Sequence, residues 1–310
     1  MNNNINVSMV IPVKNGEKHI GFLLKAIFSQ DVNFRFEVII VDSGSKDKTF
    51  DIVKQYPIRL YQIKPYEFNH GLTRNFGISM AEGKYAALMT QDAEPYDNHW
   101  LMNLISAIDS DENIAGVYSK QIPYQDADVL TRMIAGRSFA SEKVKRESEI
   151  KNPEEYKKLS PQEKHRFCNF DNVSSCIRKA VWKKIPFPET EFGEDVEWAK
   201  AVLEAGYRIN YVPDSMVYHS HEFSISGWYK RNRANSSKLA ALFGIHTIDN
   251  VFRLAAFFII YAVRDVFYIF RNKNRLRGIF RKIHLVLFYS LAGVFGQYKG
   301  TMDSKCLKRR

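Results

Sequence analysis

The chain has 310 residues, of which 45% are hydrophobic and 14% aromatic. This composition is typical of a folded protein with one large domain and an appendage, or with two modest domains. Residues 226–310 carry 17 Lys and Arg against 3 Asp and Glu, a net +14, whereas residues 1–225 carry 28 against 31, a net −3. The basic charge therefore belongs to the C-terminal region, which argues against a protein that is basic throughout and indicates a local anionic partner.

Three cysteines, Cys168, Cys176 and Cys306, show neither a CxxC pair nor zinc-ligand spacing, which favours a reducing, cytoplasmic setting. The N-terminal residues have no basic and apolar regions of a secretory signal, so we expect none. No run of 18 uncharged apolar residues occurs, and we predict no transmembrane helix. A nucleic-acid binder is disfavoured because the basic residues alternate with long apolar runs and no recognition motif is evident.

The first 90 residues alternate short apolar runs with helical periodicity. Strands are predicted at Val7–Val13, Phe36–Val41, Ile58–Ile63 and Tyr85–Thr90, and helices over His19–Ser29, from about Thr49, and over Thr73–Ala81. The second strand is apolar throughout, as expected for a central strand of a parallel sheet. Polar loops follow the strands, so the pattern predicts an α/β fold that binds ligand at the carboxyl edge of its sheet.

Two acids two residues apart, Asp92 and Glu94, stand where the apolar run Tyr85–Met89 stops. Carboxylates at the rim of a sheet suit Mg²⁺ or Mn²⁺, which take oxygen ligands, although a polar turn after a strand is the alternative. Much later, His219 and His221 stand two residues apart on an extended segment, so their side chains point to the same side. Imidazole nitrogens can complete the shell of a cation held by Asp92.

Beyond residue 115 the pattern predicts a strand over Gly116–Gln121, a polar segment over residues 126–163 that is helical or mobile, and a strand-like return at Asn172–Ile177. The paired acids Glu194 and Asp195 open a helix that runs to Gly206, and a strand ends near Val212. Acids at a helix start are often only favourable charges near the helix dipole.

Two apolar and basic segments, Val251–Phe270 and Ile279–Phe295, follow near the C-terminus. At about 100° per residue, a helix presents Arg253, Arg264 and Arg271 within about 20° of one another. One interpretation is a helical pair packed on the preceding domain. The other is a helical pair lying on an anionic bilayer, which the terminal residues 308–310 (Lys-Arg-Arg) also favour.

Several motifs in sequence order resemble glycosyltransferase family 2. They are Val10–Asn15, Val41–Thr49, Thr73–Gly77 and the acidic turn. The family has the GT-A fold, a Rossmann-like, mostly parallel sheet flanked by helices. The resemblance covers about residues 5–225, which would form a GT-A domain with a donor half (1–115) and an acceptor half (116–225), followed by a helical appendage (226–310). The combination of Phe68–Asn75 with Thr90–Ala93 is similar to the bacterial rhamnosyltransferase branch.

This resemblance implies an inverting glycosyltransferase that uses a divalent cation, Mg²⁺ or Mn²⁺. The implied donor is a nucleoside-diphosphate sugar, dTDP-L-rhamnose or a UDP-sugar. The implied acceptor is a glycan or a polyprenyl-diphosphate-linked glycan of bacterial surface polysaccharide synthesis, at the inner face of the cell membrane. The alternative is a catalytically silent module that binds a nucleotide-sugar or glycan within an envelope complex.

The resemblance also implies roles for single residues. Asp195 would be the general base, assisted by Glu194, and Asp92 the cation ligand, with His219, His221 and Glu94 as further candidates. The first acid of the family's Asp-x-Asp motif is replaced by Thr90, so that match is partial. Donor contacts are expected from Pro12, Val13, Asn15, Glu17, Asp42, Ser43, His70, Arg74, Gln91 and Asp92.

Two of these donor contacts have specific roles with plain alternatives. Asp42 would read the base of the nucleotide, and the alternative is an acid that forms a turn. Arg74 would contact phosphate through its guanidinium, and the alternative is a salt bridge.

Overall fold

The computed structural model describes residues 5–271 and 279–307, and the chain groups into two compact units. The sheet unit comprises residues 1–122, 138–158 and 167–219. The helical unit comprises residues 123–137, 159–166 and 220–310. These units are defined by contacts, and the predicted domains, 1–225 and 226–310, stay a prediction. The terminal residues 308–310, which favoured a bilayer, lie outside the described residues.

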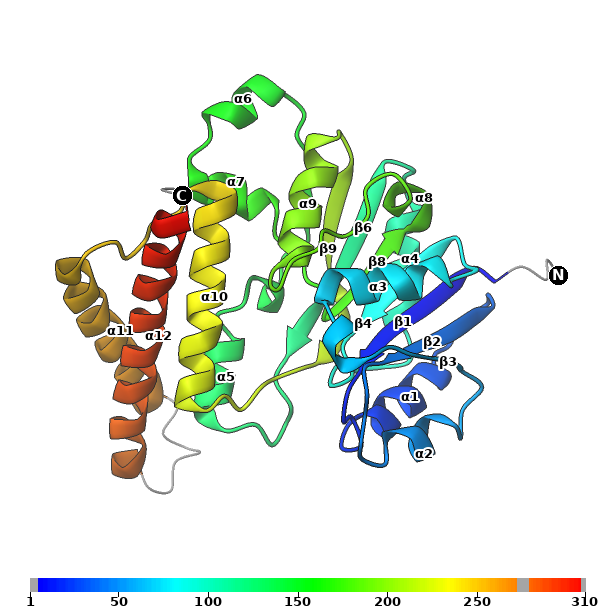
Figure 1. Cartoon of the computed structure of the whole chain (residues 1–310), viewed down its shortest axis with the longest axis horizontal. Helices are drawn as coiled ribbons and strands as arrows, with labels where there is room; N and C mark the ends of the chain where they lie inside the picture. Colours follow the sequence, from blue (N-terminus) through cyan, green and yellow to red (C-terminus); the bar gives the residue numbers. More distant parts are fainter. Residues whose placement is uncertain (1–4, 272–278, 308–310) are drawn as a thin grey trace. The chain divides into compact units, whose positions relative to one another are not determined.

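A mixed, mostly parallel sheet forms the centre of the sheet unit (Figure 1), with the strand order β3-β2-β1-β4-β8-β6-β9-β5 and with β7 beside β9. Neighbours are parallel except that β8 runs against β4 and β6, and that β5 and β7 run against β9. The strands are β1 Val7–Val13, β2 Phe36–Asp42, β3 Arg59–Gln62, β4 Tyr85–Met89, β5 Glu94–Pro95, β6 Ile114–Ile122, β7 Arg146–Ser148, β8 Ser174–Arg178 and β9 Arg208–Tyr218.

Helices follow most of these strands. Those of the sheet unit are α1 Ile20–Phe28, α2 Thr49–Val53, α3 His70–Ser79, α4 Trp100–Asp109, α6 Pro153–Lys158, α8 Lys179–Trp182 and α9 Glu194–Glu204, with 3-10 turns η1 Pro65–Glu67 and η2 Phe139–Ser141. Those of the helical unit are α5 Val129–Ala135, α10 Ile225–Phe243, α11 Val251–Arg271 and α12 Ile279–Leu307. Helix α7, Pro161–Phe167, falls almost entirely in the helical unit.

Apolar periodicity explains the core of the sheet unit. Strand β1 pairs with β2 on one side and β4 on the other, and all its residues except Pro12 are buried, as its continuous apolar run requires. Helix α1 buries Ile20, Leu23, Leu24 and Ile27, the helical stripe that the sequence predicts. Both predictions are confirmed.

The strand directions bring the ends of six described strands to one edge of the sheet. Strands β1, β2, β3, β4, β6 and β9 run the same way, and β8 runs the opposite way, so β8 begins where the others end. The loops after the parallel strands therefore meet the segment that precedes β8. This carboxyl edge is where the sequence predicts the ligand site.

Some elements differ from their predicted bounds for identifiable reasons. Strand β9 continues to Tyr218, past the predicted end near Val212, because a register shift at Ser119/Lys120 lets it resume pairing with β6. Helix α3 begins at His70 rather than Thr73, because the Asn69 side chain accepts hydrogen bonds from the next free backbone N–H groups. Helix α4 was not predicted.

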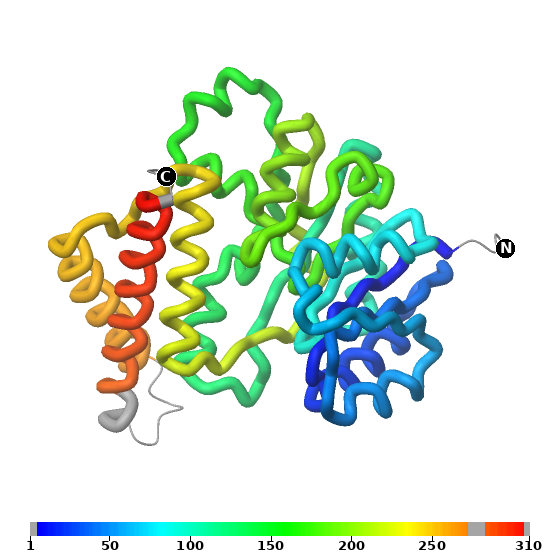
Figure 2. Tube along the Cα trace, in the orientation of Figure 1, coloured from blue at the N-terminus to red at the C-terminus, as the bar shows by residue number. Residues whose placement is uncertain are grey.

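Close helix contact organises the helical unit. Figures 1 and 2 show α12 running alongside α10, and a Cβ atom built on Gly300 would lie 2.2 Å from the carbonyl oxygen of Arg233. Leu130 and Met133 of helix α5 pack in one apolar cluster with Ile269 of α11 and Val286 of α12. Within the described ranges, none of the helices combines the length and apolar character needed to cross a membrane.

Substituting Gly300 tests this helix contact. We expect Gly300→Ala to lower the unfolding free energy by about 1–3 kcal/mol through overpacking against α10, although alanine alone favours a helix by about 1 kcal/mol. Thermal unfolding followed by circular dichroism measures the change. The exposed neighbour Lys299 supplies the control, Lys299→Ala, for which we expect a change within about 0.5 kcal/mol. A Gly300→Ala melting temperature equal to or above the wild type would contradict the close contact.

Candidate active site

Two loops at the carboxyl edge are locked together by hydrogen bonds. The Asn15 side-chain oxygen accepts from the Lys46 backbone N–H at 2.9 Å, and the Ser45 hydroxyl oxygen accepts from the Asn15 N–H at 2.8 Å. The Glu17 carboxylate accepts from the Lys48 N–H at 3.1 Å. The β1–α1 loop, which carries the predicted donor contacts Asn15 and Glu17, is therefore held in one conformation by the β2–α2 loop.

Asp42 lies buried at the end of β2 and builds the turn that follows it. Its carboxylate accepts from the backbone N–H groups of Gly44, at 2.9 Å, and Ser45, at 3.1 Å, and from the Ser45 hydroxyl. The next residue, Ser43, donates its N–H to the Val13 carbonyl at 2.9 Å. Asp42 thus has the turn-forming role that the sequence offers as an alternative, and its contact with a nucleotide base stays a prediction.

Gln91 ties the acidic turn to the β1–α1 loop. Its side-chain oxygen accepts from the Lys14 N–H at 2.9 Å, and its amide nitrogen donates to the Lys14 carbonyl at 3.1 Å. Both ends of the amide are thus bonded to one backbone unit. This contact fixes Asp92, the next residue, beside the predicted donor loop.

The Phe68–Asn75 motif anchors a segment from the acceptor half. Asn69 caps α3 and donates to the Thr190 carbonyl at 3.0 Å, and Asn75 donates to the Phe187 carbonyl at 2.8 Å. His70 is exposed, with its ring 5.0 Å from the Phe68 ring. The motif therefore holds the chain that leads into α9.

Arg74 and Glu194 form a buried ion pair between α3 and α9, with the guanidinium nitrogen 3.0 Å from the carboxylate. Asn172 also donates to this carboxylate at 3.3 Å. Burial alone would raise the pKa of Glu194, but Arg74 and then His70 outweigh it and hold this pKa below its ordinary value. Glu194 therefore stays a carboxylate, and the predicted contact of Arg74 with donor phosphate stays a prediction.

Asp195 follows Glu194 at the start of α9 and has the opposite electrostatic environment. Its carboxyl accepts from the Val196 N–H at 2.8 Å and from the Asn172 N–H at 3.4 Å. Burial, followed by the negative charges of Glu194 and Asp171, raises the pKa of Asp195 to about 8. The pKa values of these two adjacent acids thus differ: Glu194 is ionised, and Asp195 can accept and release a proton near neutral pH.

Asp92 lies beside His219, which follows the end of β9. The Asp92 carboxylate oxygen is 3.9 Å from His219 Nε2. One cation about 2.1 Å from each atom fits between them, because twice that length exceeds their separation. Glu94 lies in the short strand β5, opposite Tyr218 of the antiparallel strand β9. His221 is exposed and belongs to the helical unit, and its role and that of Glu94 as ligands stay predictions.

Two residues that sequence reasoning missed connect these groups. Gln121, near the end of β6, donates to the Asp171 carboxylate at 2.7 Å, and its amide oxygen lies 2.9 Å from His219 Nδ1. Asp171 in turn acts electrostatically on Asp195. The only sequence signal was their position: Gln121 ends the predicted strand Gly116–Gln121, and Asp171 directly precedes the predicted strand Asn172–Ile177.

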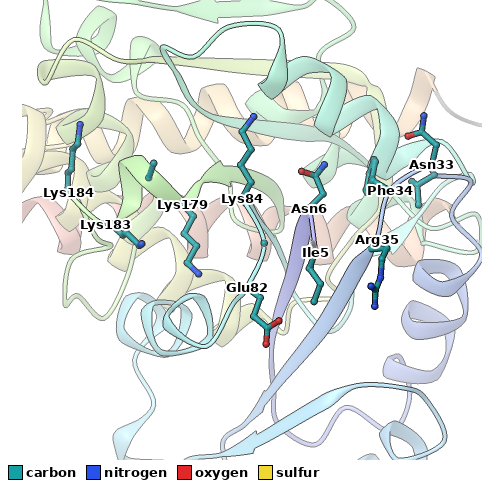
Figure 3. Close-up of a pocket in the computed structure, with 13 residues that line it drawn as sticks. Ile5, Asn6, Asn33, Phe34, Arg35, Glu82, Lys84, Lys179, Lys183 and Lys184 are labelled. Atoms are coloured by element: carbon teal, nitrogen blue, oxygen red, sulfur yellow. The ribbon is translucent and has the colours of Figure 1, made fainter. Parts of the chain in front are cut away.

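A separate hollow lies at the opposite edge of the sheet, where the parallel strands begin (Figure 3). Its lining side chains include Arg35, Lys84, Lys179, Lys183 and Lys184, and they include none of the predicted site residues. The predicted residues of the sheet unit gather instead around the carboxyl edge.

Comparison with known proteins identifies the family. The family model for glycosyl transferase family 2 matches residues 8–173. The O-antigen chain rhamnosyltransferase WbaN of Salmonella anatum is 32% identical over 200 residues, which cover 64% of this chain and 60% of WbaN. RfbN of Salmonella typhimurium, of the same description, is 28% identical over 222 residues, covering 70% of this chain and 67% of RfbN. The match thus spans about two thirds or less of these curated relatives.

Solved structures show the same fold at low sequence identity. Residues 1–349 of TarS from Staphylococcus aureus, in complex with UDP, match with a TM-score of 0.54 and 19% identity, covering 95% of this chain and 91% of that one. The mannosyltransferase PcManGT from Pyrobaculum calidifontis, in complex with GDP-Man and Mn²⁺, has a TM-score of 0.54 and 16% identity, covering 99% and 76%. The α/β sheet is of the GT-A type, and the chain belongs to glycosyl transferase family 2.

Proposed function

We propose that the chain is an inverting glycosyltransferase that moves a sugar from a nucleoside diphosphate to an acceptor hydroxyl. The observation that carries this proposal is the contrast between the adjacent acids Glu194 and Asp195. Arg74 pairs with Glu194 at 3.0 Å and helps to hold its pKa down, whereas burial and the charge of Glu194 raise the pKa of Asp195. A silent binding module has no need for an acid with a raised pKa beside one that is held ionised. A base poised near neutral pH suits the abstraction of a hydroxyl proton.

In this reaction Asp195 takes the proton of the acceptor hydroxyl while the hydroxyl oxygen attacks the anomeric carbon of the donor sugar. The new C–O bond forms as the bond between that carbon and the diphosphate oxygen breaks, and the diphosphate leaves with the electron pair. Attack from the face opposite the leaving group inverts the anomeric carbon, so no covalent enzyme intermediate is needed. Glu194, held by Arg74, keeps its negative charge and fixes the start of α9.

The proposed donor is dTDP-L-rhamnose, with a UDP-sugar as the alternative. The Salmonella relatives are described as O-antigen chain rhamnosyltransferases, and TarS was solved with UDP and with UDP-GlcNAc. The interlocked loops that carry Asn15, Glu17 and Asp42 are the proposed place for the nucleotide. The proposed acceptor is a growing glycan, free or polyprenyl-diphosphate-linked, of a bacterial surface polysaccharide.

A divalent cation, Mg²⁺ or Mn²⁺, fits the residues at the end of β4. We propose Asp92 and His219 as ligands, supported by their 3.9 Å separation, with His221 and Glu94 as further candidates. A carboxylate and an imidazole form a donor set that accepts Mn²⁺ more readily than Mg²⁺. When bound, the cation would supply positive charge that stabilises the departing diphosphate.

The helical unit offers a surface for an anionic bilayer. Helix α11 exposes a continuous apolar face, which spans an arc of about 100° at 3.6 residues per turn. Its members are Phe252, Ile259, Ile260, Val263, Phe267 and Phe270. Beside this arc lies the predicted stripe of Arg253, Arg264 and Arg271, which are exposed. Apolar side chains flanked by arginines suit a helix that lies at the boundary of anionic lipid headgroups and acyl chains.

Replacing Asp195 tests the proposed base. We expect Asp195→Asn to bind donor almost normally and to transfer sugar at least about 100-fold more slowly. In the wild type, kcat/KM should rise with pH and level off above about pH 8, because the raised pKa keeps Asp195 protonated, and inactive as a base, at lower pH. The variant should lose this pH dependence.

Two further variants complete this test. The exposed acid Glu191 lies four residues away, and Glu191→Gln should leave both rate and pH profile unchanged. A mild Asp195→Asn defect together with a crippling Glu194→Gln defect would assign the base to the other acid.

Replacing Asp92 tests the cation site. We expect Asp92→Asn to raise the Mn²⁺ concentration needed for half-maximal transfer by about tenfold or more, because a neutral amide is a poorer ligand for a hard cation. The exposed Asp31, three residues after the end of α1, supplies the control Asp31→Asn. Transfer by Asp92→Asn that matches the wild type across the Mn²⁺ titration would remove Asp92 from the site.

Serine substitutions on α11 test the bilayer surface. Phe252, Val263 and Phe267 are 84%, 66% and 65% exposed, so replacing all three should spare the fold while lowering partition to anionic vesicles about tenfold or more. Sedimentation with anionic and with zwitterionic vesicles measures the partition, and added salt should weaken only the charge-dependent part.

The sheet unit supplies the control for this experiment. Phe22 and Val144 are 65% and 74% exposed, and their replacement by serine should leave vesicle binding unchanged. Equal partition of the α11 variant and the wild type would contradict the bilayer surface. A wild-type dimer that becomes monomeric in the α11 variant would assign this face to a second copy of the chain.

A further inference from the structure

The imidazole of His219 is held by a side chain that has no role in the family resemblance. Gln121 projects from β6 and places its amide oxygen 2.9 Å from His219 Nδ1. Its amide nitrogen lies 2.7 Å from an oxygen of the Asp171 carboxylate. Asp171 is itself fixed, because its other oxygen accepts from the Val173 N–H at 2.8 Å. The three side chains therefore form a connected series from the start of β8 to the end of β9.

Hydrogen-bond chemistry fixes the direction of this series. An ionised carboxylate only accepts, so the group of Gln121 that faces Asp171 must be its NH₂ donor. The amide oxygen then faces His219, and because an amide oxygen only accepts, Nδ1 must carry a proton. In the neutral imidazole the lone pair is then on Nε2, the atom 3.9 Å from the Asp92 carboxylate.

We propose that Gln121 is a positioning residue that, oriented by Asp171, holds His219 in the Nδ1–H tautomer with its Nε2 lone pair toward Asp92. Two acceptors that face each other across 3.9 Å favour a cation between them. The inference rests on the proposed function for its consequence in catalysis. The tautomer of His219 itself depends only on hydrogen bonds within this chain, and not on whether the chain transfers a sugar.

The same series joins the cation site to the proposed base. Asp171 stands next to Asn172, whose backbone N–H lies 3.4 Å from the Asp195 carboxyl. The carboxylate that orients Gln121 is also one of the negative charges that act on Asp195. A change at Asp171 should therefore affect both ends of the site, whereas a change at Gln121 should affect the cation end alone.

Nitrogen-15 NMR of histidine-labelled, full-length chain without metal tests the tautomer directly. We expect the His219 signals, assigned by loss in His219→Gln, to show a protonated Nδ1 and an unprotonated Nε2. In Gln121→Leu, which keeps the side-chain size but removes both hydrogen bonds, this preference should be lost. Asp171→Asn should also weaken it, because an asparagine no longer dictates which end of the Gln121 amide faces His219. A wild-type His219 with its proton on Nε2 overturns the proposal.

Binding of Mn²⁺ alone, measured by electron paramagnetic resonance, supplies a second readout. We expect Gln121→Leu to weaken Mn²⁺ binding by about 10–100-fold, the usual effect of losing the hydrogen bond that orients a ligating histidine. Lys120→Gln, at the neighbouring position of β6 whose side chain points to the other face of the sheet, should bind as the wild type does. Unchanged Mn²⁺ affinity in Gln121→Leu, with an unchanged tautomer, overturns the proposal.

Failure of the proposed function would give a different result. If the chain transfers no sugar from any nucleotide donor, the wild-type tautomer and its loss in Gln121→Leu should still be observed. Conversely, active transferase with His219 protonated on Nε2 would reject the role of Gln121 and leave the proposed reaction intact.

Discussion

The buried ion pair between Arg74 and Glu194 joins two helices that come from distant parts of the chain, and the arrangement of the site depends on it. Removing one partner of such a pair costs about 3–5 kcal/mol, because the other charge is left buried without compensation. The Phe68–Asn75 motif strengthens the same junction, since Asn69 and Asn75 bind the backbone that leads into α9. The start of α9 is thereby placed against the carboxyl edge of the sheet.

This ion pair also determines which acid can carry a proton. Arg74 stabilises the negative charge of Glu194, and that charge in turn disfavours ionisation of the neighbouring Asp195. Asp171 adds a second negative charge that acts in the same direction. Two acids that are adjacent in sequence thus have distinct chemical properties, which supports the proposed division between an orienting carboxylate and a general base.

The two units differ in how far their apolar side chains are buried. In the sheet unit the apolar run of β1 and the apolar stripe Ile20, Leu23, Leu24 and Ile27 of α1 are buried in the core. In α11 much of the apolar surface stays exposed while Asp265 is buried and paired with Arg137 at 2.6 Å. Contiguous exposed apolar surface of this kind marks an interaction site in soluble proteins, and the excess of basic residues favours an anionic partner.

Local sequence patterns predict several of the elements and the candidate chemistry. Strand β1 and helices α1 and α9 were predictable because their periodicity is local, and Asp92, Glu194 and Asp195 were predictable because they stand at the ends of such elements. The partners of these residues depend on the tertiary structure, because Arg74 and Glu194 are 120 residues apart in the sequence and Gln121 and Asp171 are 50 residues apart. Those pairs depend on strand order and direction, which bring distant residues together and leave no periodic trace in either segment.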